Sequence, residues 1–166
     1  LFDLVFTHSE ALCSLDKKRV VYFPFGSTWI PEPARLIYPK SKNVSIIVSK
    51  KNVVAGHQLR HQVVGFFGNK IDVFGRAYQE IPDKITGLKD YRYSIAIENS
   101  RIDSYFTEKL LDCFLTGTVP IYWGCPKIGS FFDSAGIISF QALADLSSIF
   151  DTISEEDYQR RLPAIR

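Results

Sequence analysis

Apolar residues follow two alternating spacings along most of the chain. From residue 44 onward, short apolar runs are separated by longer stretches in which apolar positions recur about every three or four residues. The short runs predict strands at residues 44–48, 71–74, 93–97, 118–123 and 137–140. The longer stretches predict helices at 57–67, 105–116 and 141–151, with another beginning near Ser154, where a capping-box-like pattern starts. This alternation is typical of an α/β fold, here a Rossmann-like parallel sheet with helices on both faces.

The first forty residues follow a different pattern. Two short apolar runs, at 2–6 and 19–23, flank a turn or short helix, and a Pro-rich connector follows at 24–33. The change predicts two parts in the chain. Residues 1–40 end in a linker, and residues 41–166 form the domain that contains the sheet.

A polar segment follows the strand predicted at 93–97. Its residues are Glu98, Asn99 and Ser100, and they leave the carboxyl end of that strand. Ligands of open α/β sheets bind at the carboxyl ends of the strands. We therefore expect this segment to line a binding site.

The helix predicted after this segment directs its amino end toward the same edge of the sheet. We expect Asp103 or Ser104 to cap it and Gly117 to end it. Unpaired N–H groups and the charge of Lys109 in the first turn favour a bound phosphate, while Glu108 can accept hydrogen bonds from sugar hydroxyls. Taken singly, both residues have a plainer interpretation: Glu108 complements the helix dipole, and Lys109 is solvated.

Arg60 is a second candidate for contact with phosphate. It lies near the start of the helix predicted at 57–67, and its guanidinium can hold two phosphate oxygens at once. The alternative is an ordinary surface arginine on the polar side of that helix. The local pattern alone favours this alternative.

Several motifs together resemble one enzyme family. They are Glu98-Asn-Ser, Tyr105-Phe-Thr-Glu-Lys109, the run from Gly117 to Pro126, Asp72-Val-Phe-Gly-Arg76, and Ser45-Ile-Ile-Val-Ser49 followed by Leu59-Arg60. This set resembles the α1,3/4-fucosyltransferases, glycosyltransferase family 10, over roughly residues 44–140. The resemblance implies that the chain is the C-terminal, donor-binding half of a GT-B glycosyltransferase. Residues 1–40 would then be the remnant of the N-terminal acceptor domain and its linker.

The resemblance also implies an activity and a set of site residues. The activity is inverting transfer of fucose from GDP-fucose to a glycan hydroxyl. The implied contacts are Arg60 and Lys109 on the diphosphate, with Ser49, Asn99, Tyr105 and Glu108 lining the nucleotide-sugar pocket. No catalytic base is named, because the family is thought to take it from the N-terminal domain and the local pattern around Glu10 does not match it.

Two other functions remain open at this point. The chain could belong to a GT-B enzyme that uses another nucleotide-sugar donor, because residues that hold phosphate do not select the sugar. It could also be a non-catalytic nucleotide-binding module. The family's chemistry implies no cofactor besides the donor substrate, and we expect no metal requirement.

Composition limits the remaining possibilities. The chain has 166 residues, a net charge of +2 and 46% apolar content, which suits one ordinary domain. No basic run suggests a nucleic-acid partner, and no apolar run approaches the ~20 residues of a membrane span. The complete lack of methionine suggests a piece of a longer protein.

The cysteines and histidines add little chemistry. Cys113 is expected in the core, and the i, i+4 pair His57 and His61 lacks a third metal ligand nearby, so we expect no metal site. Three unpaired cysteines favour a reducing compartment. We therefore expect a cytoplasmic location, with the Golgi lumen as the alternative for a eukaryotic source.

Overall fold

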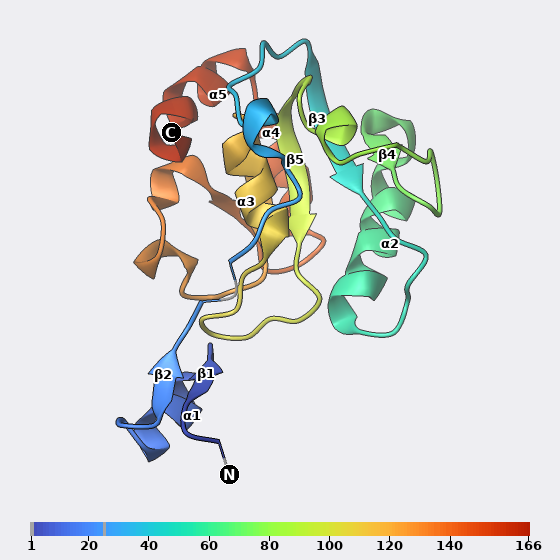
Figure 1. The fold of residues 1–166 in the computed structure, drawn as a ribbon. Coiled ribbons are helices and arrows are strands. Elements are labelled where there is room, and N and C mark those ends of the chain that lie inside the picture. The colour runs from blue at the N-terminus through green and yellow to red at the C-terminus, as the bar shows by residue number, and fades with distance from the viewer. Residues whose placement is uncertain (1, 25) are drawn as a thin grey trace.

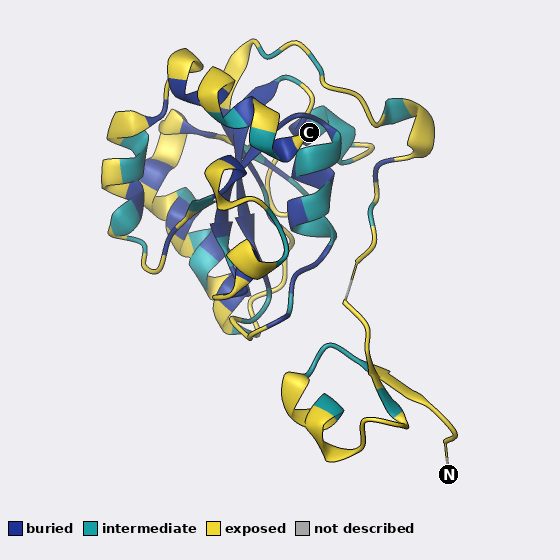
Figure 2. Cartoon of the chain, turned by 90° about the vertical axis from the view of Figure 1, so that its left-hand side faces the viewer, coloured by how far each residue is buried: buried dark blue, intermediate teal, exposed yellow. Residues whose placement is uncertain are grey.

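The computed structural model describes residues 2–24 and 26–166, which form a small N-terminal unit and a larger body (Figure 1). The unit contains strand β1 (Val5–Thr7), helix α1 (Glu10–Leu15) and strand β2 (Val20–Tyr22). Its two strands pair in parallel, separately from the main sheet. Many of its apolar side chains are exposed, as Figure 2 shows by the colour of this unit.

The larger body is built on a five-stranded sheet in the order β4-β3-β5-β6-β7, in which every pairing is parallel. Its strands are β3 (Lys42–Ile47), β4 (Asp72–Phe74), β5 (Tyr91–Ile97), β6 (Val119–Trp123) and β7 (Ile138–Ser139). Its helices are α2 (Ala55–Phe67), α3 (Glu108–Leu115), α4 (Asp145–Thr152) and α5 (Glu155–Arg161). The expectation of an α/β fold with a parallel sheet is confirmed.

Alternate residues of β5 point into two separate cores. Tyr93, Ile95 and Ile97 pack with apolar side chains of α2, α4 and α5 on one face. Ala96, on the other face, packs with the apolar side of α3. A strand covered on both faces is buried at nearly every position, which is the pattern of β5.

The segment between the N-terminal unit and β3 makes contacts with the larger body. Ile30 is buried, and the side chain of Asp112 on α3 accepts hydrogen bonds from the Thr28 hydroxyl at 2.6 Å and the Trp29 N–H at 2.9 Å. The Lys40 ammonium donates to the carbonyl oxygens of Lys89 at 3.0 Å and Thr116 at 2.8 Å. Residues 28–40 thus pack on the sheet domain, while the origin of residues 1–40 in an acceptor domain stays a prediction.

The observed ends of the elements correct the expected ones. Helix α3 begins at Glu108 after an N-cap at Thr107, so the prediction of a cap at Asp103 or Ser104 was wrong. The backbone of Ser104 has a φ of 60°, within a loop. Gly117 follows the helix with a φ of 67°, as expected for its stop signal.

Smaller shifts affect other elements. The strand expected at 2–6 is β1, and the helix expected at 141–151 is α4, which begins at Asp145. The helix expected from Ser154 is confirmed, since the Ser154 hydroxyl accepts the Asp157 N–H at 3.1 Å. Within the described residues, no helix is long and apolar enough to cross a membrane.

Candidate functional site

A cavity of about 250 Å³ lies at the carboxyl ends of β3 and β5, between the first turns of α2 and α3. Its wall includes most of the residues that the sequence singled out. These are Ser49, Arg60, Asn99, Glu108 and Lys109. The side chains come from two helices and two strand ends, so the fold brings together residues that are far apart in the sequence.

Gly56 allows the start of α2 to approach the end of β5 closely. A Cβ atom at this position would lie 1.7 Å from the Glu98 carbonyl oxygen, far inside any allowed contact. The Gly56 N–H donates to the Asn99 carbonyl at 3.1 Å. The absence of a side chain therefore permits the short distance between α2 and the segment after β5.

Arg60 is buried and oriented by the same segment. Its Nε donates to the Ile97 carbonyl at 3.0 Å, and Nη2 donates to the Asn99 Oδ1 at 2.9 Å. Burial lowers the pKa of Arg60, and the nearby Glu98 and Glu108 oppose that shift. An arginine stays charged in proteins, so Arg60 is a fixed cation in the cavity wall rather than a solvated surface residue.

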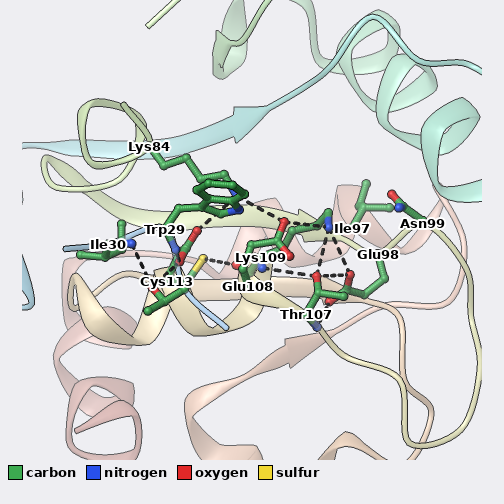
Figure 3. A network of polar contacts seen from close by, with 12 residues as sticks. Trp29, Ile30, Lys84, Ile97, Glu98, Asn99, Thr107, Glu108, Lys109 and Cys113 are labelled. Atoms are coloured by element: carbon green, nitrogen blue, oxygen red, sulfur yellow. Dashed lines mark hydrogen bonds and ion pairs between the residues drawn. The ribbon is translucent and has the colours of Figure 1, made fainter. Parts of the chain in front are cut away.

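Glu98 holds the start of α3 in place. Its carboxylate is fully buried and accepts the Thr107 N–H at 2.8 Å and the Thr107 hydroxyl at 2.7 Å. Lys109 Nζ lies 3.5 Å from the same carboxylate. Figure 3 shows these three side chains together where β5 and α3 meet. The buried charge of Glu98 is therefore paired and hydrogen-bonded.

A chain of ion pairs joins four residues of the cavity wall. Glu108 Oε1 lies 3.1 Å from Lys109 Nζ and 3.3 Å from Lys84 Nζ, and Lys84 also lies 3.2 Å from Asp112. Burial alone would raise the pKa of Glu108, but Lys109 and Lys84 hold that pKa at about 2. Glu108 is therefore a permanent carboxylate acceptor at the pH of any ordinary assay.

Several cavity residues were not singled out as donor ligands from the sequence. Lys84 lies in the loop between β4 and β5, where no pattern marked it, and its Nζ is 5.8 Å from the centre of the Trp29 ring (Figure 3). Asp112 follows Glu108 by four residues on α3, so helical spacing could have identified it. His57 also lines the cavity, although the sequence marked it only as half of a histidine pair.

Ser49 is among the residues that line the cavity, whereas Tyr105 is not. Ser49 follows β3, lines the cavity, and accepts the Lys51 N–H at 3.4 Å. Tyr105 lies on the loop before α3, where its ring centre is 5.4 Å from that of His8 in the N-terminal unit. Burial raises the pKa of Tyr105, and the carboxylates of Glu98 and Glu108 raise it further. The Tyr105 hydroxyl thus stays protonated near these two acids.

Glu98 and Glu10 are the carboxylates to examine as a catalytic base, and both are held by other contacts in this arrangement. Both oxygens of Glu98 accept hydrogen bonds from Thr107. Glu10 accepts the Ser104 hydroxyl at 2.6 Å and pairs with Lys127 at 3.1 Å, and these contacts lower its pKa. The catalytic base therefore remains unassigned.

The two histidines on α2 do not converge on a metal. His61 contacts the Tyr78 hydroxyl at 3.0 Å and the Lys51 carbonyl at 3.2 Å. His57 points to the cavity instead. Across residues 2–24 and 26–166, no three His, Cys, Asp or Glu side chains are grouped closely enough to hold a metal ion.

Comparison with protein families gives one match over most of the chain. The family described as glycosyltransferase family 10 (fucosyltransferase), C-terminal part, matches residues 37–160. All the residues that line the cavity fall within this range.

Curated relatives include fucosyltransferases of several kinds. The chain is 27% identical over 73 residues to an α-(1,3)-fucosyltransferase of Helicobacter pylori, covering 44% of this chain and 15% of that protein. It is 41% identical over 73 residues to α-(1,3)-fucosyltransferase 4 of Rattus norvegicus, covering 41% and 16%. It is 30% identical over 76 residues to GDP-fucose protein O-fucosyltransferase 3 of Gallus gallus, covering 43% and 16%.

Solved structures share the fold. A crystal structure of an α1,3-fucosyltransferase with GDP aligns with a TM-score of 0.62 at 20% identity, covering 74% of this chain and 38% of that one. The same kind of enzyme with GDP-fucose aligns with a TM-score of 0.61 at 20% identity and the same coverage. The chain thus spans well under half the length of the proteins it matches.

Proposed function

The chain belongs to glycosyltransferase family 10, the fucosyltransferases, and from this premise we propose that its cavity binds GDP-fucose and presents the sugar for transfer to a glycan hydroxyl. The observation that carries the proposal is the convergence of Arg60 from α2 and Lys109 from α3 on one cavity at the sheet edge. Two cations in the wall of one cavity suit a diphosphate better than a single phosphate or a neutral ligand.

The diphosphate contacts follow from the way each cation is held. Arg60 uses Nε and Nη2 on the Ile97 and Asn99 oxygens, so its guanidinium is already oriented before the donor arrives. Lys109 is paired with Glu98 and Glu108, and its three donors can be shared with phosphate oxygens. Pre-oriented donors lose little freedom on binding, which favours affinity.

Glu108 and Asn99 suit the sugar portions of the donor. Glu108 stays ionised because Lys84 and Lys109 hold its pKa at about 2, so it can accept hydrogen bonds from hydroxyl groups. Asn99 has both an acceptor oxygen and a donor amide. We assign these two residues, with Ser49 and Tyr105, to the nucleotide-sugar pocket.

The proposed transfer is inverting and needs no metal. In such a transfer the leaving diphosphate gains negative charge as the glycosidic bond breaks, and an acceptor hydroxyl attacks from the opposite side after losing its proton to a base. Arg60 and Lys109 would stabilise that charge. Addition of EDTA should therefore leave the rate unchanged, whereas a rate restored only by a divalent cation would contradict this part of the proposal.

The donor can be tested by calorimetry. GDP and GDP-fucose should bind more tightly than UDP and UDP-sugars, because the solved structures that share this fold hold GDP or GDP-fucose and one relative is named for GDP-fucose. Equal affinities would favour a GT-B enzyme with another donor. If no nucleotide sugar binds, the proposal of a donor site in this chain is refuted.

Transfer itself should depend on residues outside this chain. Residues 1–166 alone should bind donor but transfer little, because loss of the base costs about 10²–10⁴ in rate and lost acceptor positioning costs more. Rapid transfer to a β-galactoside or N-acetylglucosamine acceptor by this chain would show that the base lies within it. Glu10 and Glu98 would then be the first residues to substitute.

A further inference from the structure

His57 lines the donor cavity but has no part in the function proposed above. It lies in the first turn of α2, three residues before Arg60, and its exposed fraction is only 7%. Residues three apart on a helix share a face. The imidazole therefore lies beside the cation that is assigned to the diphosphate.

The contacts of the imidazole define its state in the empty cavity. Nδ1 accepts the Val53 N–H at 3.4 Å, so the neutral ring carries its proton on Nε2. The side chain of Asn99 is a further hydrogen-bond partner of His57, and it also accepts from Arg60 at 2.9 Å. His57, Arg60 and Asn99 thus form one connected group.

The charged groups that shift the pKa of His57 are all cations. Burial lowers the pKa of His57, Arg60 on the same helix and Lys51 on the preceding loop lower it further, and Lys109 on α3 adds a smaller effect. The hydrogen bond with Asn99 acts in the opposite direction. Without a ligand, the ring is therefore neutral at pH 7, and an arriving anion would reverse the local balance of charge.

We propose that His57 is an additional phosphate-contacting residue, which takes up one proton from solvent when a nucleotide diphosphate sugar binds. The inference rests on the proposed function, because it needs the diphosphate to enter this cavity. The proton joins Nδ1, the long contact with the Val53 N–H is lost, and the ring becomes an imidazolium with two donors. No bond of the nucleotide sugar breaks in this step.

Proton uptake makes donor affinity depend on pH in one direction. Binding raises the pKa of His57 from a value below its ordinary 6.5. Affinity is then constant below the pKa of the free protein and falls as the pH rises toward the pKa of the complex. Each unit by which the two pKa values differ corresponds to about tenfold in affinity.

The test is calorimetry with GDP-fucose, whose two phosphates are both esterified and do not titrate near neutral pH. Binding is measured at several pH values in two buffers that differ in their heat of ionisation, which gives the number of protons taken up. The native sequence should take up a fraction of a proton near about pH 6.5. It should bind GDP-fucose at least about threefold more weakly at pH 8 than at about pH 6.5. His57→Gln should take up none and show a flat pH dependence.

A matched control is available one turn along the same helix. His61 contacts Tyr78 and the Lys51 carbonyl instead of the cavity, so His61→Gln should retain the proton uptake of the native sequence. If His57 only orders the loop at Val53, His57→Gln would weaken binding equally at every pH and the native sequence would take up no proton.

The outcomes separate this inference from the donor assignment. Tight GDP-fucose binding without proton uptake by the native sequence would overturn the role of His57 and leave the proposed function intact. If UDP-sugars bind as tightly as GDP-fucose and their binding also takes up a proton, the donor assignment is overturned and the role of His57 is supported. The measurement on the native sequence decides the inference even if a variant folds poorly.

Discussion

Glu98 and Thr107 are joined by two hydrogen bonds that connect the end of β5 to the start of α3. The Glu98 carboxylate accepts the Thr107 N–H at 2.8 Å and its hydroxyl at 2.7 Å, and the carboxylate is fully buried. The intervening loop is therefore closed at its base by a single side chain. The position of Lys109, two residues after Thr107, depends on this closure.

Replacement of Glu98 should destabilise the fold. Glu98→Ala leaves the buried Thr107 N–H without its acceptor, which should lower the free energy of unfolding by about 1–3 kcal/mol. Glu98→Gln keeps one carbonyl acceptor and should cost less. Urea denaturation measures both, and unchanged stability in Glu98→Ala would contradict the structural role.

Loss of either proposed diphosphate cation should weaken GDP binding. Arg60→Ala and Lys109→Ala should each cost about 1.5–3 kcal/mol, the range for charge-assisted hydrogen bonds. GMP lacks the β-phosphate and should be less sensitive to one of the two changes. Arg101, whose exposed side chain contacts Gln141, provides a control, since Arg101→Ala should leave GDP affinity unchanged. Calorimetry on Arg60→Ala that returns native affinity would remove Arg60 from the site.

Two glycines of α2 should respond in opposite ways to the same substitution. Gly56→Ala places a methyl group 1.7 Å from the Glu98 carbonyl oxygen and must displace the helix start, so both stability and GDP affinity should fall. Gly65→Ala meets nothing within 4 Å and should raise stability by about 0.5–1 kcal/mol, because alanine favours the helix. Thermal unfolding and calorimetry measure the two effects. Equal behaviour of the two variants would contradict the close approach at Gly56.

Acid should weaken the contribution of Glu108. Lys109 and Lys84 lower its pKa from 4.5 to about 2, so its favourable pairing is complete above pH 4.5 and is lost as the pH falls through about 2. Glu108→Gln should therefore be less stable than the native sequence near neutral pH and approach it in acid. Thermal unfolding across this range provides the measurement. Glu80→Gln, at an exposed side chain, should show the native pH dependence.

The sequence allowed the sheet and most helices to be predicted, because their spacing of apolar residues reflects burial directly. Tyr93, Ile95 and Ile97 form one core, and Ala96 belongs to the other, as a strand covered on both faces requires. The start of α3 was predicted wrongly because its cap depends on Glu98, which lies nine positions before Thr107 and acts through tertiary structure. Local pattern could not show this contact.

The site was predictable only where residues lie next to a recognisable motif. Glu108 and Lys109 belong to such a motif, and the structure places both in the cavity wall, although their contacts with donor stay predictions. Lys84 lies in a loop with no such signal, and it reaches the cavity because its ion pairs with Glu108 and Asp112 hold it there. Residues of this kind become visible only when the loops are positioned in space.

The ion pairs in the cavity wall also affect how fast a donor arrives. Lys51, Arg60, Lys84 and Lys109 are four cations, and Glu98, Glu108 and Asp112 are three anions, so the region carries only one net positive charge. A nearly balanced site exerts a weak long-range field on an approaching anion. Association should therefore change little with ionic strength, and differences in affinity among variants should appear mainly in the lifetime of the bound nucleotide.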